Sequence, residues 1–222
     1  MHAWNLTPAE AVDLQNRLAK QVCAYGDVKS VRWVAGADIS VPRGSNMGIA
    51  ALVVLSYPSL ELVEVQVETA SLSFPYIPGF LSFREAPLII NLFEKLRHRP
   101  DLLLVDGHGI AHPRRFGIAS HLGLWLDVPT IGCAKSRLFG KHAELNIEAG
   151  SVAYLYDNGV IIGTALRTRR GSSPLYVSSG HNISLENALQ WVLSCTRGYR
   201  LPEPTRLAHL VAGCKLPVTY VA

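Results

Sequence analysis

A β-strand is predicted by residues 31–40, Val-Arg-Trp-Val-Ala-Gly-Ala-Asp-Ile-Ser, which are largely apolar and place an aspartate near the end of the strand. A turn at residues 42–46 leads to residues 48–57, which are almost wholly apolar, as in a strand that is covered on both faces. Residues 62–68, Leu-Val-Glu-Val-Gln-Val-Glu, alternate strictly, which is typical of a strand at the margin of a sheet. Three strands joined by short turns predict an antiparallel meander.

After this meander the pattern alternates between helices and strands. Leu88, Leu92 and Leu96 lie on one helical stripe, and residues 101–106 predict a short buried strand parallel to the first one. We further expect helices at residues 7–24, 116–126 and about 185–196, and strands at 129–134, 152–156, 160–167 and 175–178. A meander followed by β-α-β units predicts an α/β mixed sheet with helices on both faces. Because no linker or repeat interrupts the pattern, we expect a single domain over residues 1–222.

The composition excludes several classes of protein. Hydrophobic residues make up 49% of the 222 residues and charged residues 17%, which excludes a disordered chain. The longest apolar run, residues 48–55, is far shorter than the roughly 20 residues that a membrane span needs. We expect no secretory signal, because no charged segment followed by an apolar one opens the sequence, and the four cysteines are widely spaced. We therefore expect a cytoplasmic protein with reduced thiols and no membrane contact.

The net charge of +4 is distributed unevenly along the chain. Residues 1–100 hold nine basic and nine acidic side chains, whereas residues 101–222 hold twelve and eight, so the excess lies in the second half. This charge permits a polyanionic partner without demanding one. The basic side chains that could face a phosphate backbone are Arg114, Arg115, Lys135, Arg137, Lys141, Arg167, Arg169 and Arg170. An ordinary solvated basic face is the alternative.

Three acidic residues stand where an α/β sheet forms its sites. Asp106 follows the buried strand and precedes Gly107, at the edge of the sheet where ligands bind. Asp38 taken alone is better explained as a strand-end residue that caps a turn. Because Pro87 fits best in the first turn of its helix, Glu85 is expected near the helix N-terminus and facing the sheet, although it could simply complement the helix dipole. Together the three carboxylates could hold hard divalent cations, and two such ions would stabilise an in-line phosphoryl displacement.

Histidines in this region allow further hypotheses. The spacing of Asp106, His108 and His112 resembles that of zinc ligands, but the same loop holds no further Cys or acidic ligand, so zinc ranks low. Together with His121, they could equally be loop or interior histidines satisfied by hydrogen bonds. His181 follows three small residues and could serve as acid, base or phosphate contact, or be a buried structural histidine.

The segment Pro75-Tyr76-Ile77-Pro78 is the most unusual local feature of the chain. Two prolines fix the backbone on either side of two bulky side chains, which leaves a loop tip with little conformational entropy to lose. Such a stiff apolar wedge could insert between bases and help to extrude a nucleotide. A turn whose tyrosine packs back on the domain is the alternative.

Taken together, these motifs resemble endonuclease V, the deoxyinosine 3′-endonuclease family. The resemblance runs in one order from about residue 31 to residue 206. It is carried by Gly-Ala-Asp at 36–38, Pro-Tyr-Ile-Pro-Gly-Phe-Leu-Ser-Phe-Arg-Glu at 75–85, Asp-Gly-His-Gly at 106–109, His-Pro-Arg at 112–114, Ala-Ser-His at 119–121, Pro-Thr-Ile-Gly at 129–132, Ala-Lys at 134–135 and Arg-Leu-Pro-Glu-Pro at 200–204.

The resemblance implies a ribonuclease H-like fold, in agreement with the predicted sheet. It also implies a nuclease that uses Mg²⁺, with Mn²⁺ as a substitute, and recognises deaminated bases in DNA, chiefly hypoxanthine. Such enzymes hydrolyse the second phosphodiester bond 3′ to the lesion and leave 3′-hydroxyl and 5′-phosphate ends. From the family we also expect a monomer.

The resemblance also assigns roles to residues. Asp38, Glu85 and Asp106 match the metal-binding catalytic acids, and Tyr76 matches the wedge, flanked by Ile77 and Pro78. The loops that match the lesion pocket contain Gly79, Leu81, Gly107 and Ile118. Lys135 and His181 match catalytic positions near the scissile phosphate. Arg114, in the basic half, is expected to contact the substrate.

Two alternatives stay open. A ribonuclease H-like nuclease that cuts inosine-containing RNA or branched DNA would use the same acids, although a Tyr76 wedge favours lesion recognition. A protein that binds lesions without cutting is the other, and the intact Asp38, Glu85 and Asp106 argue against it.

Overall fold

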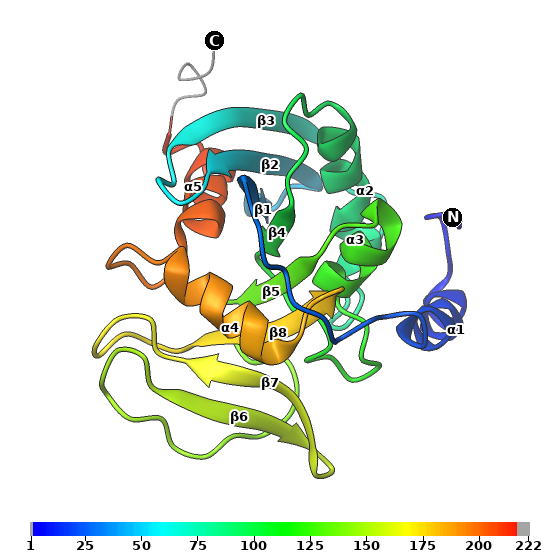
Figure 1. The fold of residues 1–222 in the computed structure, drawn as a ribbon. Coiled ribbons are helices and arrows are strands. Elements are labelled where there is room, and N and C mark those ends of the chain that lie inside the picture. Colours follow the sequence, from blue (N-terminus) through cyan, green and yellow to red (C-terminus); the bar gives the residue numbers. More distant parts are fainter. Residues whose placement is uncertain (1, 217–222) are drawn as a thin grey trace.

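The computed structural model describes residues 2–216 and builds them around one eight-stranded mixed sheet (Figure 1). The order of the strands across the sheet is β3-β2-β1-β4-β5-β8-β7-β6. The strands are β1 (Trp33–Ser40), β2 (Met47–Ser56), β3 (Leu62–Ser71), β4 (Leu102–Val105), β5 (Thr130–Ala134), β6 (Val152–Asp157), β7 (Val160–Leu166) and β8 (Leu175–His181). All predicted strands are present. The single domain was predicted over residues 1–222, of which Met1 and 217–222 lie outside the described residues.

The pairing of the strands confirms the predicted architecture. Strands β1, β2 and β3 form an antiparallel meander, and β3 lies at the edge of the sheet, as its alternating pattern indicated. Strand β4 pairs in parallel with β1 on one side and with β5 on the other. In this register Ala37 pairs with Val105, the last residue of β4, and β1 continues to Ser40. The residues that follow these two positions are Asp38 and Asp106.

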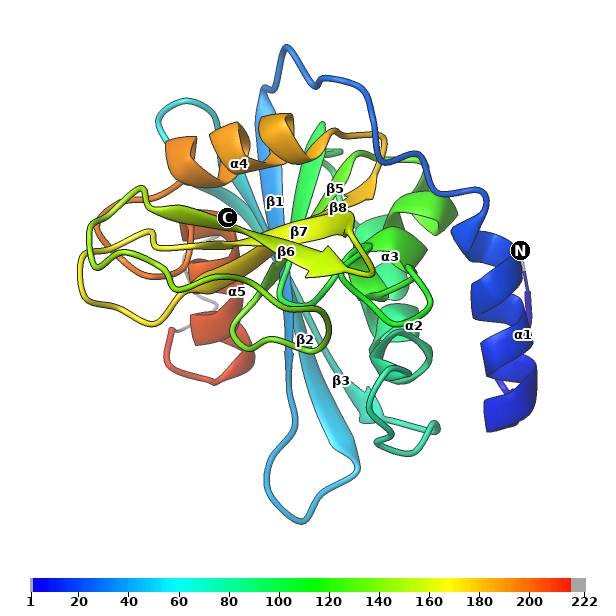
Figure 2. The same ribbon diagram turned by 90° about the horizontal axis from the view of Figure 1, so that it is seen from below.

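Residues 2–216 form five helices, which are α1 (Pro8–Ala19), α2 (Leu81–Glu94), α3 (Ile118–Leu126), α4 (Leu185–Ser194) and α5 (Glu203–Ala212). Of these, α2, α3, α4 and α5 pack on the sheet, and α1 packs outside α2 against Phe74, Phe80 and Phe83. Figure 2 shows α4 and α5 on one side of the sheet and α1, α2 and α3 on the other. Helix α1 has the predicted capping box, in which Thr7 and Glu10 bond each other's backbone, but it ends at Ala19 and not at residue 24.

Two predictions about helices were wrong. The helix at about 185–196 was expected to be the last one, but α5 follows it. Pro87 does not lie in the first turn of α2, since this helix begins at Leu81, directly after the loop that ends at Gly79. Helix α2 contains the proline in its interior, where packing of its many buried apolar residues offsets the missing hydrogen bond. Glu85 therefore lies in the second turn of α2.

The core consists of apolar side chains from both faces of the central strands. Leu103 packs toward α2 and α3, whereas Leu102 and Leu104 pack toward α4. Strand β4 is therefore buried on both faces, as its unbroken apolar sequence predicted. On the α5 side, Gly36 in β1 leaves room for the backbone of Pro204, because a Cβ atom at this glycine would lie 2.0 Å from the Pro204 carbonyl oxygen. This contact seats the N-terminus of α5 directly on β1.

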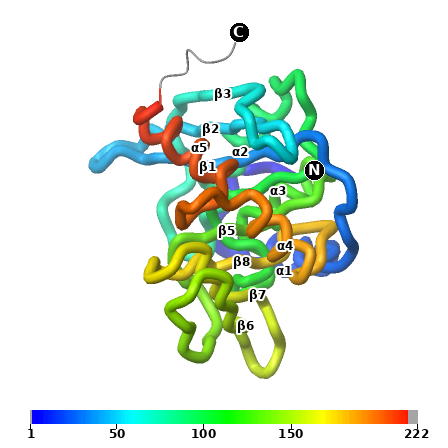
Figure 3. The backbone as a smooth tube through the Cα atoms, turned by 60° about the vertical axis from the view of Figure 1, so that its left-hand side comes forward, coloured from blue at the N-terminus to red at the C-terminus, as the bar shows by residue number. Residues whose placement is uncertain are grey.

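An extended segment, residues 20–32, connects α1 to β1 and runs past α4 (Figures 1 and 3). The backbone N–H of Val28 donates to Asn187, and the indole of Trp191 donates to the Val28 carbonyl, which holds this segment on the helix. Among residues 2–216, no helix is long and apolar enough to cross a membrane.

Candidate active site

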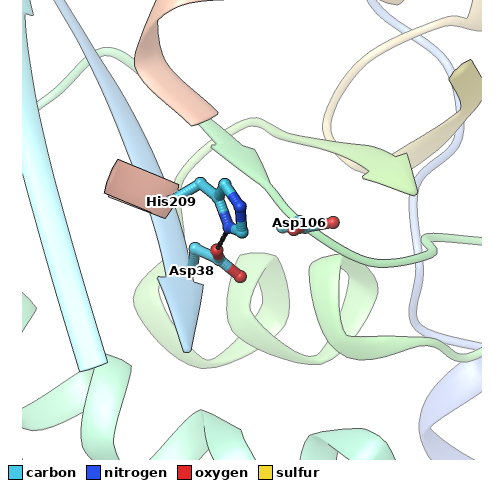
Figure 4. Close-up of side chains that lie close together, drawn as sticks. All are labelled: Asp38, Asp106 and His209. Carbon is cyan, nitrogen blue, oxygen red and sulfur yellow. Dashed lines mark hydrogen bonds and ion pairs between the residues drawn. The ribbon is translucent and has the colours of Figure 1, made fainter. Parts of the chain in front are cut away.

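Two carboxylates lie side by side at the ends of β1 and β4. The backbone N–H of Asp106 donates to the Ala37 carbonyl over 2.9 Å, which extends the β1–β4 pairing by one residue. Asp38 is buried, and its Oδ1 atom accepts a hydrogen bond from the backbone N–H of Ile39 at 2.9 Å. Figure 4 shows both side chains pointing into the space between the strand ends and α5. The predicted pairing of these two acids is therefore present.

Glu85 approaches the same place from α2. It lines a narrow crevice together with Asp38, Asp106, Ile89 and Ile118. Burial, together with the negative charges of Asp38 and Asp106, raises the pKa of Glu85 to about 8. Burial and the charge of Asp38 also raise the pKa of Asp106, to about 6, although Lys135 opposes this effect. Three carboxyl groups in one crevice repel one another, which favours a cation among them.

Two nitrogen-bearing side chains complete the cluster. The Nδ1 atom of His209, from α5, lies 2.7 Å from Asp38 Oδ2 (Figure 4). Lys135, directly after β5, forms an ion pair with Asp106, and its Nζ atom lies 3.7 Å from Asp38 Oδ2 and 3.0 Å from His209 Nδ1. Two acids, a lysine and a histidine thus share one small volume, and Lys135 partly neutralises the carboxylates.

The donor set fits a divalent cation. Within residues 2–216, one group of acidic and histidine side chains could hold a metal ion, namely Asp38, Asp106 and His209, whose ligand atoms lie within 4.8 Å of one another. Glu85 adds a third carboxylate at the edge of this group. Carboxylate oxygens are the ligands of hard cations such as Mg²⁺ and Mn²⁺, and a bound cation would lower the raised pKa values of Glu85 and Asp106.

A cavity of about 340 Å³ opens beside these acids. Asp106 and Lys135 form part of its wall, and Gly79, Leu81, Gly107 and Ile118, which were predicted to form a base pocket, form another part. Its volume lies in the range of about 300–1,000 Å³ that is typical of small-molecule sites. The structure therefore brings the predicted pocket residues together, next to the predicted acids.

The loop Pro75-Tyr76-Ile77-Pro78 forms the rim of this cavity. Tyr76 is 73% exposed, so the alternative in which the tyrosine packs back on the domain does not apply. Ile77, in contrast, is partly buried against Phe74, Phe80 and Phe83. The loop thus presents one free aromatic side chain on an anchored base.

His181 does not lie near the acids. Strands β5 and β8 are antiparallel, and His181 pairs with Thr130 at the beginning of β5, whereas Lys135 follows the other end of that strand. The ring of His181 accepts a hydrogen bond from the backbone N–H of Cys23 over 3.2 Å. This placement agrees with the structural alternative for His181 and separates it from the acids by the length of β5.

His209, and not His181, is the histidine that lies beside the acids, and the sequence prediction missed it. A signal was present in the sequence. Pro202-Glu203-Pro204 has the residue types of a helix N-terminus, and the apolar residues Leu207, Ala208, Val211 and Ala212 follow at helical spacing. Such a helix, seated on β1 by its N-terminus, brings His209 to the end of the strand.

The three histidines of the central region are all bonded within the protein. His108 Nε2 lies 3.0 Å from the Ser136 carbonyl, His112 Nε2 lies 3.0 Å from the Gly79 carbonyl, and His121 Nε2 lies 2.7 Å from His2 Nε2. Burial lowers the pKa of His108 and of His112 to about 4, which keeps both rings neutral. The zinc spacing of this loop is thus not assembled into a metal site.

Arg114 was expected to contact the substrate, and its side chain lies behind the wedge loop. The guanidinium donates to the Gly79 carbonyl at 2.9 Å and to Gln15 Oε1 at 2.6 Å, and it stacks 4.6 Å above the ring of Phe80. A direct contact between Arg114 and the substrate stays a prediction.

Comparison with known proteins identifies relatives of this chain. A sequence model of the family described as Endonuclease V matches residues 16–210. Endonuclease V of Dehalococcoides mccartyi is 57% identical over 212 residues, which cover 96% of this chain and 95% of that protein. The crystal structure of endonuclease V from Streptomyces avermitilis has a TM-score of 0.89 at 36% identity and covers 96% of this chain and 94% of its own.

A third relative was crystallised with nucleic acid. Endonuclease V of Ciona intestinalis, in complex with a 23mer DNA that contains an inosine followed by a ribo-adenosine, has a TM-score of 0.82 at 27% identity and covers 95% of this chain and 98% of its own. The likeness to these solved structures confirms the ribonuclease H-like fold that the sequence motifs implied.

Proposed function

The chain belongs to the endonuclease V family, and we propose that it recognises deaminated bases in DNA, chiefly deoxyinosine, and nicks the strand that carries them. We further propose that it hydrolyses the second phosphodiester bond 3′ to the lesion, with Mg²⁺ or, as a substitute, Mn²⁺. The products would be 3′-hydroxyl and 5′-phosphate ends. The observation that carries this proposal is the cavity that opens between the exposed Tyr76 and Asp106, a member of the carboxylate cluster that also contains Asp38.

Base recognition follows from the shape of this cavity. Hypoxanthine pairs weakly, so its extrusion from the duplex costs less than that of a matched base. Tyr76 would fill the gap that the extruded base leaves in the stack. The base would enter the cavity, where Gly79 and Gly107 leave the backbone accessible to its edge. The Ciona complexes, which contain an inosine in DNA, support this assignment by family.

Strand hydrolysis would take place at the acids. Asp38, Asp106 and Glu85 would hold the divalent cation, which when bound supplies activation of water and stabilisation of charge on the phosphate. His209, hydrogen-bonded to Asp38, would orient that carboxylate. The ammonium group of Lys135 lies at the same point and would contact an oxygen of the scissile phosphate.

A nicking assay tests the proposal. An end-labelled duplex with one deoxyinosine and a matched duplex without it are incubated with the wild type and with Asp106→Asn, each in Mg²⁺ or in EDTA. We expect the wild type to cut the deoxyinosine duplex in Mg²⁺. We expect no cutting in EDTA, none of the matched duplex and none by Asp106→Asn. Asp13→Asn is the matched control, because Asp13 is an exposed aspartate of α1. Equal cutting of both duplexes, or cutting in EDTA, would overturn the proposal.

Inosine-containing RNA is a second candidate substrate. The DNA in the Ciona complexes has a ribo-adenosine after the inosine, so that relative binds a strand with a ribonucleotide next to the lesion. The same assay with a single-stranded RNA that contains one inosine compares the two substrates, and faster cutting of the RNA would favour this candidate.

We also propose that the chain acts as a single domain, as a monomer and in the cytoplasm. Four cysteines without a disulfide among them support a reducing compartment.

A further inference from the structure

We infer that Gln15, on α1, is a positioning residue that sets the distance between two walls of the base pocket. This inference rests on the proposed function, because it assigns a role in base recognition to a residue that does not reach the acids. Gln15 is 1% exposed and is the one polar side chain among the buried residues of α1, beside Ala11 and Leu14. A buried amide is costly unless its hydrogen bonds are made, so its bonds show what it holds.

Gln15 bonds both walls of the pocket. Its Nε2 atom donates to the Gly79 carbonyl over 3.0 Å and to the Phe116 carbonyl over 3.2 Å. Gly79 ends the wedge loop on one side of the cavity, whereas Phe116 leads through Gly117 into Ile118 on the other. The two N–H bonds of one planar amide therefore fix the separation of these two backbone segments.

The Gly79 carbonyl is held by two further donors. Arg114 Nη2 donates to it over 2.9 Å and His112 Nε2 over 3.0 Å. The backbone N–H of Arg114 donates to His112 Nδ1, which requires the proton of the neutral ring to be on Nε2. Gln15 Oε1 in turn accepts from Arg114 Nε over 2.6 Å, so Gln15 orients one of the other donors as well.

This network holds the backbone of the wedge loop at Gly79. Gly79 has φ +85°, a conformation that L side chains rarely adopt, and a Cβ atom there would lie 2.9 Å from Arg114 Nη2. Three donors on one carbonyl hold the peptide that follows this residue in one orientation. The rim that carries Tyr76 is thereby tied to a helix that lies 64 residues earlier in the chain.

Attachment of α1 does not require this amide. The apolar residues of α1 already pack against Phe74, Phe80 and Phe83. An apolar side chain at position 15 would extend that contact without the cost of burying an amide. The amide of Gln15 thus positions the two pocket walls more than it attaches α1 to the domain. We therefore expect its loss to lower the affinity for the lesion.

The test compares Gln15→Glu with Asn16→Asp. The first change keeps the size of the side chain and the acceptor for Arg114, and it removes both N–H donors. The second makes the same chemical change on the neighbouring exposed residue of α1. Single-turnover nicking of a deoxyinosine duplex in Mg²⁺, at increasing enzyme concentration, gives a half-saturating concentration and a maximal rate. Gln15→Met, which has no amide at all, is measured beside them.

We expect the half-saturating concentration to rise about tenfold in Gln15→Glu and Gln15→Met, from the loss of two hydrogen bonds. The maximal rate should stay close to that of the wild type, because the acids are untouched. Asn16→Asp should match the wild type in both values. Thermal melting of each variant, measured in parallel, identifies loss of fold.

Three results would overturn the inference. Unchanged half-saturation in Gln15→Glu would show that the amide sets no distance that matters. A fall in maximal rate that follows the loss of melting temperature would show a purely structural role. An equal effect of Asn16→Asp would show that charge on α1 is responsible. If the wild type does not nick the deoxyinosine duplex, the proposed function itself is overturned. That result comes from the wild type and is therefore distinct from any effect of the Gln15 variants.

Discussion

Replacing Glu85 by glutamine removes a carboxyl group whose ionisation opposes folding of the metal-free protein. Burial and the neighbouring charges of Asp38 and Asp106 raise the pKa of Glu85 to about 8, from an ordinary value of 4.5. Below pH 4.5 the group is protonated in the folded and the unfolded state, so it has no effect on stability. As the pH rises toward 8, only the unfolded state loses the proton, and the folded state loses stability.

The magnitude follows from this pH interval. Each pH unit between the two pKa values changes the free energy of unfolding by about 1.4 kcal/mol. The full effect, reached above pH 8, is therefore on the order of 5 kcal/mol. A domain has a total stability of roughly 5–15 kcal/mol, so this loss is large. Glu85→Gln is neutral at every pH and should escape it.

Urea unfolding in EDTA at several pH values between 5 and 9 measures the effect. The variant and the wild type should be close to each other at pH 5, and the variant should be more stable by several kcal/mol at pH 9, on the order of the estimate above. Mg²⁺ should stabilise the wild type more than the variant, because the variant lacks one carboxylate of the site. Glu94→Gln serves as the control, since Glu94 is exposed on the same helix.

Parallel pH profiles for Glu85→Gln and the wild type would refute this reasoning. They would mean that Glu85 ionises in the folded protein as easily as in the unfolded chain, and that the crevice does not bury it. A similar shift in Glu94→Gln would assign the effect to the charge of α2 as a whole.

Three further predictions concern stability, the seat of α5 and the wedge. Glu64 is buried, but hydrogen bonds from Gln66, Arg97 and His98 lower its pKa to about 2 from 4.5, so it stabilises the folded state above pH 4.5 by about 3 kcal/mol and loses this effect as the pH falls toward 2. Glu64→Gln should therefore lower the free energy of unfolding at pH 7 and differ less from the wild type at pH 3, and an equal difference at both would contradict this. Gly36→Ala should destabilise the fold by about 1–3 kcal/mol or more and reduce nicking, because the added Cβ displaces α5 and with it His209; unchanged melting and nicking would show that α5 is not needed at this place. Tyr76→Ala should reduce the preference for a deoxyinosine duplex over a normal duplex more than it reduces Mg²⁺ affinity, measured by competition binding and by metal titration, and an equal loss of both would point to misfolding.

The acids of the site could be predicted because strand ends are local features. Asp38 and Asp106 each follow an apolar run that forms a central strand, and strands that pair in parallel end at the same edge of the sheet. Glu85 approaches Asp38 and Asp106 from the facing helix, as predicted, although Pro87 suggested a helix that begins later. The apolar stripe of α2 sets the face of the helix, and this face does not depend on where the helix begins.

The side chains that come from distant segments could not be predicted in the same way. His209 contacts Asp38 although it lies 171 positions later in the chain. The contact forms because Gly36 leaves room for the backbone of Pro204, so that α5 packs on β1. Gln15 reaches Gly79 from the first helix. The spacing of the apolar residues indicates the helix that carries His209, but where a helix packs across the sheet depends on contacts between distant segments, which that spacing does not encode. The sequence prediction named His181 from the small residues that precede it and from the family resemblance, and neither signal contains this packing information.

The position and chemistry of the nick test the central claim most directly. A duplex with one deoxyinosine, labelled at the 5′ end of the lesion strand, is incubated with the wild type in Mg²⁺ and the product is sized at single-nucleotide resolution. We predict a single nick at the second phosphodiester bond 3′ to the lesion, with a 3′-hydroxyl that a polymerase extends and a 5′-phosphate that a ligase joins. No nick, or a nick that falls at the same place in a duplex without deoxyinosine, would contradict the account.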